Sequence, residues 1–251
     1  MKVLCTGGCG YVGSVLVPKL LDAGHEVLVV DCMWFGNYLP EKYHLQVLRD
    51  DIRNGVDCTG YEAVIHLANI ANDPASELDP KLTWEINALA TMQLAESAVR
   101  AGVKQFIYAS SGSVYGVNNS PAVTESAPLY PLSEYNKTKA VAERVMLSYA
   151  DKMAVQILRP ATVCGLSPRM RMDVAVNGLT IQALTNEEIT VFGGSQMRPN
   201  IHIEDMADLY LFMLDRPHLT GIYNAGFQNL SIMAIAQTIA KRAKVTLTVS
   251  E

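Results

Sequence analysis

The sequence predicts an α/β fold, a doubly wound parallel sheet followed by a smaller C-terminal lobe. Three observations lead to this prediction. Short runs rich in Val, Ile and Leu alternate with longer segments of helical period, which is typical of a parallel sheet with helices on both faces. Several glycines crowd the turn after the first run. After Pro160 the chain becomes richer in Gly, Pro, Arg and Asn, and its apolar runs shorten.

The elements can be placed in order along the first part of the chain. Strands are expected at residues 2–6, 26–31, 45–50, 63–68, 104–110 and 154–160, with helices at about 11–23, 83–101 and 133–150. Several strands are apolar on both faces, as buried parallel strands are. Gly24 and Gly102 end two of the helices as caps. We therefore expect a dinucleotide-binding domain over residues 1–160.

The rest of the chain, residues 161–251, is expected to form a smaller substrate-binding lobe. Helical patterns recur near 173–186, 204–215 and 231–242. The two parts are expected to share one cleft.

Composition narrows the function classes. The net charge of −5 comes without a basic stripe, which argues against a nucleic-acid partner. Five cysteines without a C-x-x-C pair are expected to be reduced thiols. The longest apolar runs are too short to span a bilayer, and no signal peptide precedes the first strand. We expect a cytoplasmic protein without a membrane partner or a bound metal.

The glycine-rich turn "CTGGCGYVGSVL" lies between the first strand and the first helix, where a Rossmann-type sheet binds pyrophosphate. Its spacing is G-x-x-G-x-x-G. Gly7 permits the tight turn, Gly10 lets the backbone approach the phosphates, and Gly13 lets the helix close on the strand. Asp31 ends the second strand, where a carboxylate accepts hydrogen bonds from a ribose 2′-hydroxyl and repels a 2′-phosphate. This pattern favours NAD over NADP.

A catalytic group is predicted from "SSGSVYG" and "SEYNKTK". Tyr135 and Lys139 are four residues apart on a predicted helix, so they share one face. Ser111 follows the fifth strand at its C-terminal end. We expect the Lys139 ammonium, together with a positive nicotinamide ring, to lower the pKa of Tyr135. Ser111 would hold the substrate oxygen while Tyr135 transfers its proton and C4 of the nicotinamide takes a hydride.

The motifs "TGGCGYVG", "VIHLA", "SSGSVYG", "YNKTK" and "RPNIHIEDMA" together resemble the extended short-chain dehydrogenase/reductase family. Within that family they are similar to the NAD-dependent nucleotide-sugar epimerase/dehydratase branch, from residue 1 to about residue 240. The resemblance implies that Asp51 and Ile52 bind the adenine ring and that Asn87 supports the catalytic helix region through its side-chain amide. The other cofactor-binding positions it implies are Tyr11, Val12, Leu67, Ala68, Tyr135 and Lys139.

The same resemblance implies a nucleoside diphosphate-sugar as the partner in the cleft. Arg198 matches an arginine that pairs with the diphosphate, and a guanidinium fork suits phosphate oxygens. Asn177 matches a position that binds the same phosphates through a helix start. Arg169 and Arg171 add charge near that place and receive no assignment. The resemblance also suggests a homodimer packed through helices 83–101 and 133–150.

Some residues of this sequence differ from those typical of the branch, and these differences narrow the type of reaction that we expect. Gly112 and Ser113 replace the Asp-Glu pair that dehydratases use for water elimination. Ala71 stands where galactose-epimerase relatives carry a Lys, and Thr162 and Cys164 alter the motif after the sixth strand. Relatives continue for some tens of residues, so we expect the C-terminal lobe to be incomplete.

We therefore expect an NAD-dependent nucleotide-sugar epimerase that acts through a transient keto-sugar. The alternative is an NAD(P)H-dependent nucleotide 4-keto-sugar reductase with the same catalytic residues. A remote alternative is a non-catalytic dinucleotide-binding protein. The sugar, the nucleotide base and the reacting carbon are not encoded in a readable motif, because the pocket is formed by loops.

Overall fold

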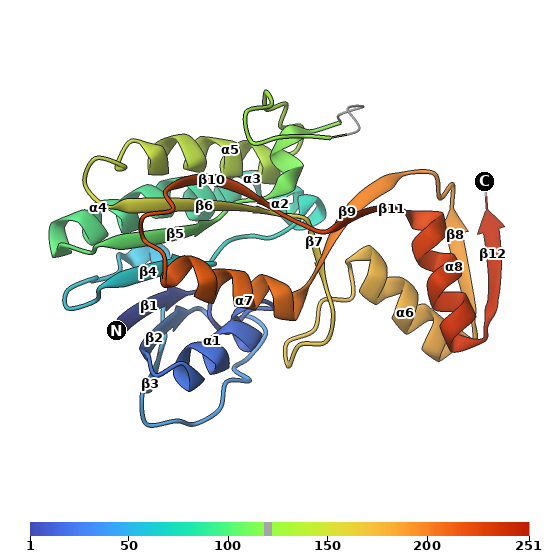
Figure 1. Ribbon diagram of the computed structural model, residues 1–251, viewed down its shortest axis with the longest axis horizontal. Helices are drawn as coiled ribbons and strands as arrows, with labels where there is room; N and C mark the ends of the chain where they lie inside the picture. The colour runs from blue at the N-terminus through green and yellow to red at the C-terminus, as the bar shows by residue number, and fades with distance from the viewer. Residues whose placement is uncertain (118–121, 251) are drawn as a thin grey trace.

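The computed structural model describes residues 1–117 and 122–250, and its centre is a sheet of seven parallel strands (Figure 1). The strands lie in the order β10-β6-β5-β4-β1-β2-β3. Their bounds are β1 Lys2–Thr6, β2 Glu26–Asp31, β3 Leu45–Arg49, β4 Ala63–His66, β5 Gln105–Ala109, β6 Ala154–Pro160 and β10 Gly221–Ala225. This arrangement confirms the predicted Rossmann-type fold. The strand order reverses between β1 and β4, and such a point is where open α/β sheets bind their ligands.

Helices cover both faces of the sheet because its strands are apolar on both sides. Helices α1 (Gly13–Asp22) and α7 (Ile203–Leu214) lie on one face, and α4 (Thr91–Ala101) and α5 (Glu134–Leu147) lie on the other (Figure 1). In β1 the buried Cys5 joins the core under α1 and α7, whereas its neighbour Leu4 joins the core under α4 and α5. This alternation follows from the two-residue repeat of a strand.

A smaller lobe extends beyond the C-terminal edge of the sheet (Figure 1). Two small sheets belong to this part of the chain, one of order β11-β9-β7 and one in which β12 pairs in parallel with β8. The strand bounds are β7 Thr162–Cys164, β8 Glu188–Phe192, β9 Met197–His202, β11 Gln228–Ser231 and β12 Thr246–Ser250. Helices α6 (Ala175–Asn186) and α8 (Ile232–Ala243) pack on β8 around their own core of Ile189, Val191 and Ala236.

A single boundary after residue 160 does not separate the main sheet and its helices from the smaller lobe. Helix α7 and strand β10 come from the predicted lobe range, yet both are part of the main sheet structure. Strand β10 pairs in parallel with β6, and α7 buries Met206 and Tyr210 in the core that it shares with α1. The chain therefore leaves the sheet after β6, returns for α7 and β10, and leaves again at β11.

Two details between β4 and β5 were not visible in the sequence pattern. Between the predicted strand 63–68 and the predicted helix 83–101 lie the short helix α2 (Asp73–Leu78) and the start of α3 (Pro80–Trp84). The predicted helix 83–101 is not uniform, because a π-helical segment at Glu85–Ala90 separates α3 from α4. Among the described residues, none of the helices combines the length and the apolar composition that a membrane span requires.

Candidate active site

The glycine-rich turn packs the ends of β1, α1 and β4 against one another. Gly7 has φ +73°, and a Cβ there would lie 2.5 Å from the backbone nitrogen of Ala68. A Cβ on Gly13 would lie 2.5 Å from the carbonyl oxygen of Gly8, so Gly13 lets α1 approach the turn. At Gly10 the nearest atom would be the Gly7 carbonyl oxygen, at 3.1 Å. At Gly7 and Gly13 the turn therefore leaves no room for a Cβ atom, because backbone atoms of the protein already occupy that space.

The N-terminus of α1 suits an anion. Val12 at its N-cap gives no side-chain hydrogen bond to the helix, and no acidic residue lies in the first turn. The positive end of the helix dipole favours phosphate, although the Ser14 and Val15 N–H groups of this first turn already donate to the Gly10 and Val12 carbonyls. The residues present fit the diphosphate of a dinucleotide at this place.

Asp31 lies beside the same turn, at the end of β2. One oxygen, Oδ2, accepts a hydrogen bond from the backbone N–H of Cys9 at 3.0 Å, and Oδ1 accepts one from Met33 at 2.7 Å. Each carboxylate oxygen can accept more than one hydrogen bond. Asp31 is thus fixed in orientation and keeps acceptor capacity for a ribose hydroxyl.

Asp51 and Ile52 are occupied by contacts within the chain. Asp51 caps a 3-10 turn at Ile52–Asn54 and forms an ion pair with Arg53, whose guanidinium also reaches Glu85 at 3.0 Å. This pairing lowers the pKa of Asp51. Ile52 is buried in a cluster with Val30 and Ile86. Contact of either residue with an adenine ring stays a prediction.

Leu67 and Ala68 follow β4 directly. The Leu67 N–H donates to the Thr6 carbonyl at 2.9 Å, and the backbone of both residues lies against Gly7. The structure therefore brings the "HLA" segment and the glycine turn together, as the expected cofactor cleft requires.

Asn87 lies in the π-helical segment and is 1% exposed. Its Oδ1 accepts from the Ile70 N–H at 2.8 Å, and its Nδ2 donates to the Ile70 carbonyl at 3.1 Å and to Thr138 Oγ1 at 3.2 Å. The amide therefore ties the loop after β4 to helix α5. Asn87 acts as a positioning residue here, and its side-chain groups are used within the protein.

Ser111, Tyr135 and Lys139 come from two neighbouring elements at the C-terminal end of the sheet. Ser111 caps a short 3-10 turn (Gly112–Tyr115) after β5, and the other two lie on α5. Lys139 is 2% exposed and donates a hydrogen bond from Nζ to the Ala109 carbonyl at 2.7 Å. Its Nζ lies 5.8 Å from the centre of the Tyr135 ring. The structure brings the three residues together.

The pKa values of this group differ from the sequence-based expectation. Burial lowers the pKa of Lys139 to about 7, with Glu143 opposing the change. Burial also raises the pKa of Tyr135, and this effect exceeds the opposing effects of a hydrogen bond with Ser111 and of the Arg171 charge. In the protein chain alone, desolvation therefore determines the direction of the Tyr135 shift.

Ser113 extends the hydrogen bonds around Ser111. The two hydroxyl oxygens lie 2.7 Å apart, and Ser113 Oγ donates to Asn136 Oδ1 on α5. Because Ser113 gives its hydrogen to Asn136, Ser111 donates to Ser113.

The two predicted substrate residues lie in different environments. Asn177 is 5% exposed, and its amide is bonded to the Gly165 N–H at 2.9 Å, to Tyr11 Oη at 3.0 Å and to the Arg171 carbonyl at 2.8 Å. Its side chain links α6 to the glycine turn, so the amide is used within the protein. Arg198 is exposed on β9, where it donates to the neighbouring Met197 carbonyl. Their substrate roles stay predictions.

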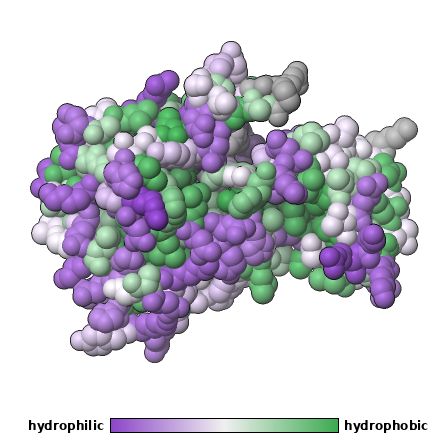
Figure 2. Space-filling view, viewed as in Figure 1, coloured by the Kyte–Doolittle hydropathy of each residue, from purple (hydrophilic) through white to green (hydrophobic). Residues whose placement is uncertain are grey.

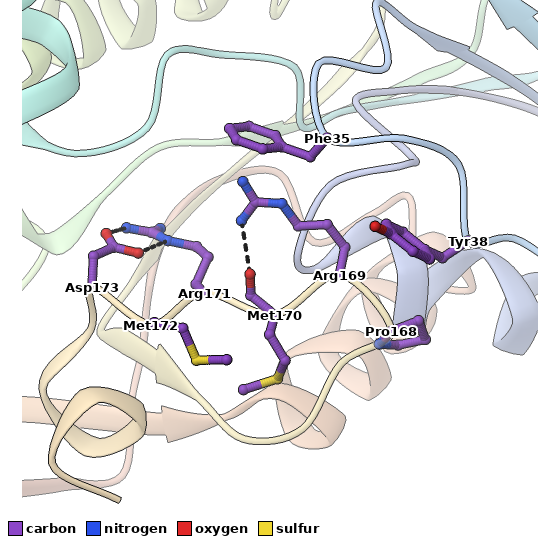
Figure 3. Close-up of a pocket in the computed structure, with 8 residues that line it drawn as sticks. All are labelled: Phe35, Tyr38, Pro168, Arg169, Met170, Arg171, Met172 and Asp173. Carbon is purple, nitrogen blue, oxygen red and sulfur yellow. Dashed lines mark hydrogen bonds and ion pairs between the residues drawn. The ribbon is translucent and has the colours of Figure 1, made fainter. Parts of the chain in front are cut away.

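A pocket of about 450 Å³ lies between the loop after β2 and the segment before α6 (Figure 3). Arg171 pairs with Asp173 at 2.5 Å, and Asp173 also accepts from Asn72 Nδ2 at 2.8 Å. Arg169 stacks on Phe35 at 3.7 Å from the ring centre. The sequence pattern gave no role to these side chains, because their meeting depends on two loops distant in the chain.

Apolar side chains gather on the smaller lobe. Figure 2 shows hydrophobic surface there, and the exposed large apolar residues of this part of the chain include Leu184, Phe192, Met197, Phe227 and Val249.

Comparisons with known proteins agree with the geometry. The model of a family described as "NAD dependent epimerase/dehydratase family" matches residues 3–226. A probable UDP-arabinose 4-epimerase 3 of Arabidopsis thaliana is 29% identical over 262 residues, and the match covers 89% of this chain but only 64% of that protein.

Two solved structures are similar over 100% of this chain. One is a UDP-glucose 4-epimerase of Thermus thermophilus in complex with NAD, with 26% identity, a TM-score of 0.87 and 86% of that chain covered. The other is an NAD-dependent NDP-hexosamine 5,6-dehydratase, TunA, involved in tunicamycin biosynthesis, with 26% identity, a TM-score of 0.90 and 84% covered.

Proposed function

The chain belongs to the NAD dependent epimerase/dehydratase family, and within that family we propose that it is an NAD-dependent nucleotide-sugar epimerase. The observation that carries the proposal is the meeting of Ser111, Tyr135 and Lys139 at the C-terminal end of the sheet. The glycine turn and Asp31 lie at the switch point of the same sheet. The reaction oxidises a ring hydroxyl to a transient ketone and then reduces it on the opposite face.

The residues present fit NAD. The glycine turn with the uncapped start of α1 would hold the diphosphate, and Asp31 would accept from the ribose hydroxyls. When bound, NAD supplies the hydride acceptor and, in its oxidised form, a cationic ring. A cofactor that is regenerated in every cycle does not need to leave the protein.

Tyr135 is the proton-transfer group. It accepts the proton of the reacting sugar hydroxyl during oxidation and returns it during reduction. Ser111 would bind the same sugar oxygen by donating its hydroxyl hydrogen to it, so this hydrogen would have to turn away from Ser113 Oγ when the sugar is bound. Lys139 is held by the Ala109 carbonyl, and in its protonated form it would stabilise the phenolate of Tyr135.

Water elimination is less well supported. The two residues after Ser111 are Gly112 and Ser113, and neither carries a carboxyl group for acid-base catalysis at that place. Ser113 is bonded to Ser111 and Asn136 instead. This difference favours epimerisation over dehydration.

The sugar nucleotide would lie between the sheet and the smaller lobe, with Arg198 and the start of α6 near its diphosphate.

The assembly would be a homodimer packed through α4 and α5. Leu89 and Val141 are exposed apolar side chains on this part of the surface, and they support the proposal of a dimer contact there. Light scattering of the purified protein, with Val141→Glu as the variant, tests the dimer: the variant should be monomeric.

The experiment is to purify the protein, release its nucleotide by denaturation, and identify it by mass spectrometry. Separately, the protein is incubated with UDP-glucose, UDP-galactose and UDP-arabinose, and the products are followed by NMR. Epimerisation without net consumption of cofactor supports the proposal. Stoichiometric oxidation of added NADPH would instead indicate the reductase.

Tyr135→Phe is the matched variant. Loss of the hydroxyl should lower turnover roughly a hundredfold or more while the protein stays folded. Turnover within a factor of ten of the wild type would contradict the role given to Tyr135.

A further inference from the structure

The segment before α6 carries two arginines in different electrostatic situations. Arg171 is paired with Asp173. Arg169, two residues earlier, makes no ion pair within the described residues 1–117 and 122–250, and its guanidinium donates only to the neighbouring Met170 carbonyl at 3.3 Å. It is half-buried, and burial and the charge of Arg171 lower its pKa. The carboxylates of Asp173 and Asp31 act on Arg169 from farther away than an ion pair. A half-buried guanidinium without a direct ion-pair partner favours an anion beside it.

Packing places this arginine beside the glycine turn. Ser167 Oγ donates to the Tyr11 carbonyl at 2.8 Å, and Tyr11 Oη donates to the Gly165 carbonyl at 2.7 Å. The segment that carries Arg169 is thus bonded to the glycine turn at two points, and Arg169 is close enough to Asp31 for an electrostatic interaction. Asp31 is itself bonded to the Cys9 N–H of that turn.

Phe35 fixes the direction of the side chain. The guanidinium carbon of Arg169 lies 3.7 Å from the centre of the Phe35 ring, and the two side chains line the same pocket (Figure 3). A stacked guanidinium loses little rotamer freedom when it binds a planar or forked anion, because it is already ordered. Phe35 comes from the loop after β2, so the pair closes the space between that loop and the segment before α6.

We propose that Arg169, stacked on Phe35, is a further cofactor-binding residue that contacts the cofactor diphosphate. The inference rests on the proposed function in that NAD is the cofactor. In this arrangement the glycine turn after β1 contacts one side of the diphosphate, and Arg169, in the segment before α6, contacts the other side. The cofactor would then join both parts of the chain, which suits an enzyme that retains NAD between turnovers.

The test uses the full-length protein, freed of bound nucleotide, and measures the Kd of NAD, ADP, adenosine and UDP by calorimetry. Arg169→Met should weaken NAD and ADP roughly ten- to a hundredfold and leave adenosine within about twofold. The loss should shrink at high ionic strength, because the contact is between charges. Arg169→Lys should recover part of the affinity.

Arg216→Met is the matched control. Arg216 also stacks on a phenylalanine, Phe212, at 3.9 Å and donates to a backbone carbonyl, but it lies after α7. This variant should bind all four ligands as the wild type does.

Other outcomes would overturn the inference. Equal loss of adenosine and ADP would mean a structural role, and loss of UDP alone would place Arg169 on the substrate diphosphate. Unchanged NAD binding by Arg169→Met, with tight binding by the wild type, would contradict only this inference. A wild type that binds no NAD would contradict the proposed function as well.

Discussion

At the scale of single residues, burial decides the chemistry of the candidate site as much as residue identity does. Lys139 has its amino group enclosed between the Ala109 carbonyl and the Tyr108 ring, 5.0 Å from the ring centre. His66 shows the same effect, because burial between Thr6 and Thr91 lowers its pKa to about 3. His66 is a structural histidine, whereas Lys139 keeps a pKa near the working pH.

The lowered pKa of Lys139 predicts a pH dependence of stability. Between about pH 7 and the ordinary lysine value of 10.5, the folded state binds fewer protons at Lys139 than the unfolded state does. The free energy of unfolding should therefore rise with pH in this window, by up to about 1.4 kcal/mol per pH unit from this group. Urea unfolding of the nucleotide-free protein at pH 7, 8 and 9 measures it.

Lys139→Met should remove this rise, and Lys152→Met, at an exposed lysine stacked on Tyr149, should keep it. The comparison stays below about pH 9 because the buried thiols Cys5 and Cys9 have raised pKa values and contribute the opposite slope above that pH. Identical pH profiles for the wild type and Lys139→Met would contradict the assignment.

At the scale of elements, the π-helical segment Glu85–Ala90 is the feature that the sequence pattern did not reveal. An apolar repeat near 3.6 residues runs through it, but the wider turn places Asn87 between the loop after β4 and Thr138 of α5. π-helical insertions in α-helices are frequent at functional sites. Here the insertion lets one amide fix two elements that line the candidate site.

Asn87→Ala should destabilise the protein by about 2–4 kcal/mol, because it leaves the N–H and carbonyl of Ile70 without their partner in the interior. Thr138→Val removes the Asn87 bond to α5 and the bond from Thr138 Oγ1 to the Tyr135 carbonyl at 2.8 Å, and it should cost about 1–2 kcal/mol. Thermal unfolding and NAD titration of both variants measure these effects. If Asn87→Ala were no less stable than Thr138→Val, the central role of the amide would be refuted.

At the scale of the whole molecule, the chain crosses between sheet and lobe more than once. Gln105 Nε2 and Gln156 Nε2 both donate to the Met213 carbonyl, so polar groups of β5 and β6 are satisfied by the end of α7. The buried side chains of α7 complete the core on one face of the sheet. The cooperative unit is therefore expected to contain residues 203–225 together with residues 1–160.

Hydrogen exchange of the intact protein tests this division. Amides of α7 and β10 should exchange at the rate of β1, β5 and β6, whereas amides of α6, β8, α8 and β12 should exchange faster, because their separate core is small. Exchange of α7 together with α8 would show that the boundary at residue 160 describes the molecule better.

Sequence patterns alone were enough to predict the sheet of the first 160 residues, the glycine turn, the place of Asp31 at a strand end and the meeting of Ser111, Tyr135 and Lys139, whose binding and catalytic roles stay predictions. These features depend on local repeats and on positions that follow a strand end or share a helix face, and such relations are fixed within a few residues. Other features arise only from long-range packing. The return of α7 and β10 to the sheet, the internal bonds of Asn177, and the stacking of Arg169 on Phe35 all join segments distant in the chain. The raised pKa of Tyr135 belongs with them, because desolvation depends on everything packed around the phenol, and no sequence spacing records it.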